Sequence, residues 1–454
     1  MMRSTKGGPA TQLGTGMLVS TACGTAVASV SAIGLVSIEH LVGGIWSALA
    51  IACGGAISLS LARCFGRLMT VVPSTAGLLA YLSRGLGRNR GLLITLPYLL
   101  LSLFLIGAEA TLIGLIFHKL SGLPAPLGSL GFLVGTWALC RAGLSISMRT
   151  QAYATWILLA ALSIMSLLLL AKSARLGSLS VHIFVPPPSI ARFLAAVGQA
   201  LFLFMGFEFI TCQVDLTTPT VMRRSLVVSS IVLLLFYATV SLGIACVTIP
   251  PLQGQALLIP QLVLAESTVG RLALLPVALL TLLSSYTSYN GALLALSRLT
   301  SALAAQRLLP RSLSQIEQRT LLPQRALLAL LGFCLIATAL VQRFNLLLPS
   351  ILGAAPCAAL AYAAVAFVRE RAPFREAARS DFSRFAGSVL ALLLVGIAVG
   401  VVLDSTVESI LPSILLVLGS AYGLTLIMLV MPRIRGVLGK SRTELLAKGG
   451  GHGA

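Results

Sequence analysis

The chain has 454 residues, of which 57% are hydrophobic and only 10% are charged, and its mean hydropathy is +0.99. In soluble domains about a quarter of all residues are charged. This composition therefore excludes a soluble protein and indicates a polytopic membrane protein. The formal charge of +20 does not indicate a nucleic-acid partner, because the basic residues stand in short clusters between apolar runs.

Twelve apolar runs are long enough to cross a hydrocarbon layer of ~30 Å. In chain order they are 13–37, 43–66, 92–117, 128–145, 152–172, 192–214, 226–249, 272–301, 326–342, 346–368, 386–403 and 409–431. The connections between them are short, so we expect no soluble domain. The sequence predicts an all-α polytopic membrane protein with about 12 transmembrane helices.

Orientation follows from the basic residues. If the N-terminal segment 1–12 lies inside, 26 of the 32 Lys and Arg residues fall on cytoplasmic segments, as the positive-inside rule requires. Both termini, including the basic tail 432–454, are therefore predicted to be cytoplasmic. The basic clusters at 369–376 and 433–435 predict contacts with anionic lipids. The short loops, together with 27 Arg against 5 Lys, favour a bacterial inner membrane.

Four segments carry a family pattern, in matching order over about the first 330 residues. They are PSTAGLLAYLSRGLG at 73–87, a weaker match at Gly143, Ser147 and Gln151, FLFMGFE at 202–208 with Asp215 and Pro219 beyond it, and NGALLALSRLTSALAAQRLLP at 290–310. Together they resemble the amino acid–polyamine–organocation superfamily, and the chain looks like an amino acid permease.

The resemblance implies an inverted repeat of five plus five helices, in which helices 1 and 6 break near the membrane midplane and the substrate lies at the breaks. The first repeat would span 13–172 and the second 192–368, followed by two further helices over 386–431. Gly24-Thr25-Ala26 and Gly206 are the candidate breaks, since glycine supplies the backbone freedom that a break needs. Close helix packing is the alternative explanation for an isolated glycine.

The expected substrate-binding residues come from the breaks and from the eighth span. They are Cys23, Gly24, Thr25, Ala26, Phe204, Met205, Gly206, Phe207, Glu208, Tyr286, Tyr289 and Asn290. Aromatic packing is the alternative explanation for the two tyrosines.

Two carboxylates stand within apolar runs, where an ionised group is costly unless it is paired or hydrated. Glu208 either lines the pathway or holds the helix break together by hydrogen bonds. Glu109 either handles substrate charge and protons or bonds one helix to another, and the bond is slightly favoured. Some relatives use a lysine of the fifth span for proton coupling, and its position would fall near Leu158 here. No lysine stands near Leu158. Glu208 and Glu109 are therefore the candidate coupling residues, and uncoupled exchange is the alternative.

The leading hypothesis is a secondary transporter of amino acids or related amines, and two intramembrane carboxylates lean toward a cationic substrate. A receptor or subunit on the same fold is the alternative. An enzyme is not expected, because the four histidines are isolated, the eight cysteines are scattered singly and no GxxxxGK[ST] loop occurs. No cofactor, metal or nucleic-acid partner is expected, and a homodimer remains open.

Overall fold

A computed structural model describes residues 13–247 and 258–369, together with 390, 391, 393–395, 419, 422, 423 and 425. Over these residues the chain is almost entirely helical and contains no β-strand beyond one isolated bridge. The elements in chain order are α1 Thr15–Ala26, α2 Ser31–Val42, α3 Gly44–Val71, α4 Leu78–Leu86, α5 Arg88–Ser121, α6 Ala125–Arg141, α7 Leu144–Arg175, α8 Leu179–Ile183, α9 Ile190–Leu203, η1 Phe207–Leu216, α10 Pro219–Ala245, α11 Pro260–Val269, η3 Arg271–Ala273, α12 Leu274–Ala305, η4 Arg311–Ser314, α13 Gln324–Arg343 and α14 Leu347–Val368.

Ten of the predicted spans correspond to these helices. Eight described helices are long and apolar enough to cross a membrane, and the bent pair α1 and α2 makes a ninth. The predicted fourth span is α6, whose 17 residues extend roughly 26 Å at the rise of an α-helix. Most of the predicted spans 386–403 and 409–431, and the basic clusters beyond Arg369, lie outside the described residues.

Two spans are interrupted, and each is the first of its half. The bend between α1 and α2 is 64°, and α9 gives way after Leu203 to the 3-10 helix η1. Helices α3, α5, α6 and α7 follow the first broken span, and α10, α12, α13 and α14 follow the second. This is the five-plus-five arrangement with broken helices 1 and 6 that the family resemblance implies. Helix 1 of this arrangement is α1 with α2, and helix 6 is α9 with η1.

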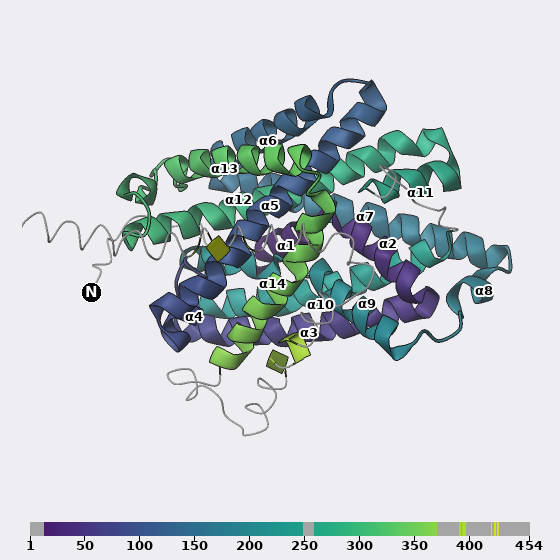
Figure 1. Cartoon of the computed structure of the whole chain (residues 1–454), viewed down its shortest axis with the longest axis horizontal. Coiled ribbons are helices and arrows are strands. Elements are labelled where there is room, and N and C mark those ends of the chain that lie inside the picture. The colour runs from purple at the N-terminus through teal and green to yellow at the C-terminus, as the bar shows by residue number, and fades with distance from the viewer. Residues whose placement is uncertain are drawn as a thin grey trace, which may run out of the picture.

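The long helices run side by side, with α1 in the middle of the bundle (Figure 1). Helix α3 packs along α10, and α1 contacts α7, α10, α12 and η1. The most apolar stretch of α5 is largely buried, whereas that of α7 is largely exposed. Exposed apolar side chains such as Ile157 and Leu168 on α7 are what a bilayer-facing helix carries. Helix α4 lies at one end of the bundle and α8 and α11 at the other (Figure 1).

Candidate functional site

The break of helix 1 lies directly after the predicted position. Gly24, Thr25 and Ala26 form the last turn of α1, and the unwound segment is residues 27–30. Side chains of α10 and α12 satisfy its carbonyls: Tyr237 donates to the oxygen of Ala26 at 3.0 Å and Ser284 Oγ to that of Val27 at 2.8 Å. Exposed main-chain groups are tolerated inside a membrane protein only where other groups satisfy them, so these bonds hold the break open.

The break of helix 6 is at the predicted glycine. Gly206 has a φ of +99°, in the left-handed region that glycine adopts at no steric cost. It separates α9 from η1. The Gly206 amide donates to Glu208 Oε2 at 3.1 Å, so a side chain from the first turn of η1 caps the break.

The two breaks touch each other. A Cβ atom at Gly206 would lie 3.1 Å from Thr25 Cγ2 and 3.2 Å from the Thr25 carbonyl oxygen. Such contacts would be tighter than an ordinary van der Waals approach, and glycine permits them. Gly206 therefore serves both the backbone turn and the close approach of helices 1 and 6.

A small cavity lies between the breaks and helices α5 and α12. Its volume is about 60 Å³, enough for a few water molecules. Among the predicted residues, Thr25, Ala26, Met205, Gly206 and Glu109 line it. The remaining lining residues are Ala28, Val30, Ser31, Tyr98, Ser102, Leu105, Ile106, Phe202, Phe209, Ser288 and Ala292.

Glu109 is the acidic residue that lines this cavity, and it is 2% exposed. Neither carboxylate oxygen has a hydrogen-bond partner of normal geometry among the described residues, although Ser288 and the Ser29 backbone lie beside it. No basic side chain of the described residues lines the cavity. Ser288 lies on α12, so a bond from Glu109 to another helix stays a prediction beside a role in handling substrate charge.

Glu208 has the opposite environment. It is equally buried but is not among the residues that line the cavity. Tyr98 of α5 donates its hydroxyl proton to Oε1, and the Gly206 amide donates to Oε2. Both oxygens are thus engaged in holding helix 6 to α5 and in capping the break.

Four of the other predicted residues of helices 1 and 6 pack against neighbouring helices. Gly24 faces α7 and α12, because a Cβ there would lie 2.2 Å from Thr155 Oγ1 and 3.0 Å from Thr287 Cβ. Phe204 packs its ring on Tyr237, with centroids 5.7 Å apart, and Phe207 packs on Phe65 at 6.1 Å. Cys23 Sγ lies 3.8 Å from the carbonyl oxygen of Ser229 on α10.

The predicted residues of the eighth span lie on a different face of α12 from the cavity. Tyr286 bonds its hydroxyl to Thr150 at 2.6 Å, and the ring of Tyr289 packs on Phe132. Asn290 Oδ1 accepts a hydrogen bond from Ser147 Oγ at 2.8 Å, and Asn290 Nδ2 donates one to Gln151 Oε1 at 2.7 Å. These contacts join α12 to α6 and α7.

The face of α12 that does meet the cavity carries Ser288 and Ala292. On α5, the lining residues Tyr98, Ser102, Leu105 and Glu109 are three or four residues apart, which places them on one face of a helix. That spacing is visible in the sequence and leads from Glu109 to Tyr98 and Ser102. Small and polar residues occur on several faces of α12, so its sequence does not indicate which face lines the cavity.

An ion pair joins α12 to the end of η1. Arg298 of α12 donates from Nη1 to both carboxylate oxygens of Asp215 at 2.7 Å, and from Nη2 to the Leu321 carbonyl at 3.4 Å. The side chain of Arg298 is 4% exposed and that of Asp215 is 46% exposed. Beside it, the Leu13 amide donates to the carbonyl oxygen of Leu216 at 2.9 Å. The start of helix 1 and the end of helix 6 are joined here.

In the described part of the chain, no group of three or more His, Cys, Asp or Glu side chains is placed to hold a metal ion. No disulfide joins the cysteines of the described residues, and most of them are buried.

Comparison with known proteins agrees with this architecture. A solved structure described as the substrate-bound outward-open state of a Na⁺-coupled sialic acid symporter resembles this chain with a TM-score of 0.54, over 87% of this chain and 91% of that one. The two sequences are 12% identical, so the likeness shows the fold. A search of curated proteins found no match. Residues 13–437 match the family described as amino acid permease. The chain therefore belongs to the amino acid permease family of the amino acid–polyamine–organocation superfamily.

Proposed function

We propose that this membrane protein is a secondary transporter of amino acids or related amines, which it moves by alternating access around the cavity between the two helix breaks. Family membership and the five-plus-five fold support transport. The small volume of the cavity, about 60 Å³, supports a mechanism in which helices move to admit the substrate. Substrate binding shifts the conformational equilibrium, concentration gradients drive the net movement, and no covalent step is needed.

The substrate carries an ammonium group. The observation that supports this is the carboxylate of Glu109, which is buried, lines the cavity and lacks a normal hydrogen-bond partner among the described residues. A buried charge without a partner is costly, and a ligand ammonium group offsets that cost. Glu208 is a weaker candidate, because Tyr98 and Gly206 already occupy its oxygens.

An α-amino acid fits the charges on both sides of the cavity. Helix α2 begins at Ser31, and Val30 and Ser31 line the cavity at its N-terminal end. The N-terminus of a helix attracts anions through its free amide groups and dipole. The substrate carboxylate would lie at this end, with the ammonium group toward Glu109.

Glu109 is also the better candidate for coupling transport to a cation. The resembling symporter is Na⁺-coupled by its description, whereas a buried carboxylate suits proton coupling equally well. Uptake into proteoliposomes under a Na⁺ gradient, a proton gradient or neither separates the three modes. Acceleration by neither gradient assigns uncoupled exchange.

The substrate is identified in two steps. Purified protein is first screened for thermal stabilisation by amino acids and polyamines, and the stabilising compounds are then tested for uptake. We expect Glu109→Gln to abolish uptake of the cationic substrate and Glu317→Gln, a change on an exposed loop, to leave it intact. Binding without uptake or exchange would instead indicate a receptor or subunit on this fold.

The remaining expectations complete the proposal. The repeats span 13–172 and 192–368, and the helix pair over 386–431 follows them. Both termini face the cytoplasm of the cell that bears the protein, and anionic lipids contact that face. The Asp215–Arg298 pair then lies on the cytoplasmic side, where it closes the exit from the central cavity.

A further inference from the structure

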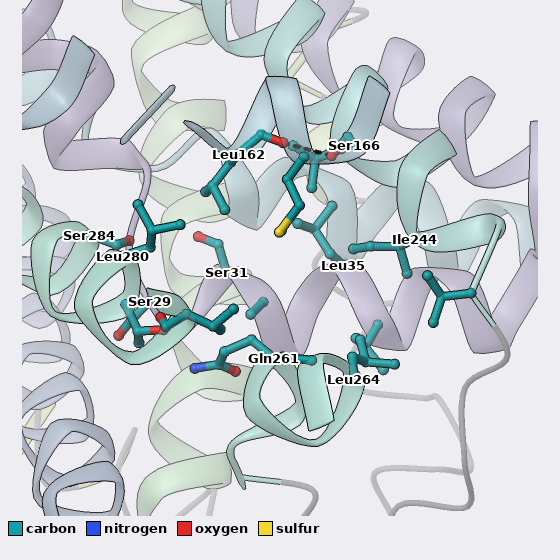
Figure 2. Close-up of a pocket in the computed structure, with 18 of the residues that line it drawn as sticks. Ser29, Ser31, Leu35, Leu162, Ser166, Ile244, Gln261, Leu264, Leu280 and Ser284 are labelled. Carbon is teal, nitrogen blue, oxygen red and sulfur yellow. Dashed lines mark hydrogen bonds between the residues drawn. The ribbon is translucent and has the colours of Figure 1, made fainter. Parts of the chain in front are cut away.

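A second cavity lies on the other side of the helix 1 break. Its volume is about 190 Å³, and it is enclosed by α2, α7, α10, α11 and α12. Figure 2 shows the side chains of Leu35, Leu162, Ile244, Leu264 and Leu280 arranged around it. Most of the described lining residues are aliphatic, and none of those residues is charged. An apolar cavity of ~150 Å³ already admits benzene, so this one has room for a larger apolar body.

The hydroxyl groups in the cavity are already committed to the protein. Ser166 donates to the Leu162 carbonyl at 2.8 Å, which is the bond dashed in Figure 2. Thr281 likewise donates to its own helix, and Ser284 to the Val27 carbonyl. Each of these hydroxyl groups donates to a main-chain carbonyl, which leaves the wall effectively apolar.

Gln261 of α11 is different. Its side-chain oxygen and nitrogen are both buried and have no hydrogen-bond partner among the described residues. It lines the cavity and extends from α11 with its amide on the side of Ser29 (Figure 2). Leaving a buried amide unpaired costs about 1–3 kcal/mol, and a ligand with one uncharged donor or acceptor offsets that cost. Apolar walls with few polar groups are what small-molecule sites have in common.

The mouth of the cavity opens on an apolar surface. Met165 and Val269 line the cavity and are 39% and 67% exposed. The neighbouring Leu272 and Leu275 are 90% and 60% exposed. Met165 and Leu275 belong to the spanning helices α7 and α12, so their part of this surface faces hydrocarbon and a ligand reaches the cavity from the membrane.

We propose that this cavity binds a neutral amphiphile that partitions into the bilayer, with an apolar body of about six to eight carbon atoms and one uncharged hydrogen-bonding group that meets Gln261. The body occupies the space among Leu35, Ile244 and Leu264. A free alcohol or amide and a lipid chain with its ester carbonyl share this chemistry.

Occupation of the cavity has a consequence for helix 1. Ala28 and Ser31 line both cavities, so the break segment is the wall between them. A ligand here fills the space into which α2 moves when it approaches α7 and α10. This consequence, unlike the binding itself, rests on the proposed transport function.

Photolabelling with a diazirine-bearing octanol tests the binding. We expect saturable labelling of peptides from α7, α10 and α11, competed by 1-octanol about three- to tenfold more strongly than by octane, as one neutral hydrogen bond provides. Gln261→Leu removes that difference. Octylammonium competes weakly, because the cavity has no group to pair with its charge. Labelling that does not saturate, or equal competition by all three compounds, overturns the proposal.

Variants that fill the cavity provide the control. Ala265→Phe and Ala273→Phe introduce a ring from two different elements and abolish saturable labelling, whereas Leu275→Phe, outside the cavity, retains it. Monodisperse elution and an unchanged unfolding temperature show that each variant is folded. Labelling of both filled variants at the wild-type level overturns the proposal.

Two further measurements separate the ligand sources and the function. Displacement of the octanol label by a long-chain phosphatidylglycerol added to delipidated protein assigns the cavity to lipid chains, and its absence assigns the cavity to free amphiphiles. Octanol is expected to slow uptake by wild type and not by Ala265→Phe. Labelling needs no transport activity, so failure of the proposed function leaves the binding result readable.

Discussion

Gly206 and Thr25 join the two helix breaks: a Cβ on Gly206 would lie 3.1 Å from Thr25 Cγ2. One residue without a side chain therefore sets how closely helices 1 and 6 approach, and its φ of +99° places a second demand on the same position. The central cavity lies against this contact, since both residues line it.

Gly206→Ala should lower the free energy of unfolding by about 1–3 kcal/mol, because a non-glycine residue at this φ is strained and the new methyl group meets Thr25. Thermal unfolding of the purified protein measures the loss. Gly332→Ala is the matched control, because Gly332 lies within α13 with nothing within 4 Å of the added Cβ. Equal unfolding temperatures for the two variants would contradict the role given to Gly206.

Gly24→Ala should cost about 1–3 kcal/mol by overpacking, since the new Cβ lies 2.2 Å from Thr155 Oγ1. That oxygen has no hydrogen-bond partner among the described residues, so Thr155→Ala removes the clash without breaking a bond. In a double-mutant cycle the second change should recover part of the loss, which is a coupling typical of residues in contact. Strict additivity would show that α1 does not pack on α7 as described.

Glu109→Gln and Glu208→Gln should have opposite effects on stability. Replacing the unpartnered Glu109 should leave the unfolding temperature unchanged or raise it, while uptake of a cationic substrate falls at least tenfold, or about 1.4 kcal/mol. Glu208→Gln should destabilise the protein by about 1–3 kcal/mol, because glutamine has one acceptor oxygen and can keep only one of the two bonds that Tyr98 and Gly206 donate.

Measuring unfolding and uptake for both variants distinguishes these roles. Tyr98→Phe provides a control for Glu208, since it removes the same bond from the other side. Loss of stability in Glu109→Gln together with normal uptake would reverse the assignment.

Asp215→Asn should destabilise the protein by about 2–3 kcal/mol, because it leaves the buried guanidinium of Arg298 without its charged partner. If the pair closes one end of the pathway, the variant should also bind substrate less selectively from the other side and leak it faster. Efflux from preloaded proteoliposomes measures the leak. The double variant Asp215→Arg, Arg298→Asp, which exchanges the two charges, is expected to restore part of the stability. If Asp215→Asn is as stable as wild type, the ion pair does not stabilise the fold.

The family pattern singled out the glycine at the break of helix 6, and the break of helix 1 lies directly after its predicted position. Gly206 marks the first, because its positive φ needs glycine. The second lies at residues 27–30, which contain no glycine. Tyr237 and Ser284, more than 200 positions away, stabilise this break by donating to the carbonyls of Ala26 and Val27, where the helix ends. No property of residues 27–30 alone predicts such partners.

The face that each helix turns toward the cavity was likewise beyond the sequence. Periodicity groups Tyr98, Ser102 and Glu109 together, but it does not say whether that group faces a cavity, lipid or another helix. On α12 the predicted residues were Tyr286, Tyr289 and Asn290, and all three make contacts away from the cavity. Tyr286 bonds to Thr150, Tyr289 packs on Phe132 and Asn290 bonds to Gln151.

The sequence by itself determined that this chain crosses a membrane, where most of its spans lie and to which family it belongs, because hydropathy and motif order are local properties. Only the tertiary structure decided that Glu109 faces the cavity while Glu208 is bonded beside it. Both are glutamates within apolar runs, and what separates them is the rotation of each helix against its neighbours, which packing across the whole bundle sets.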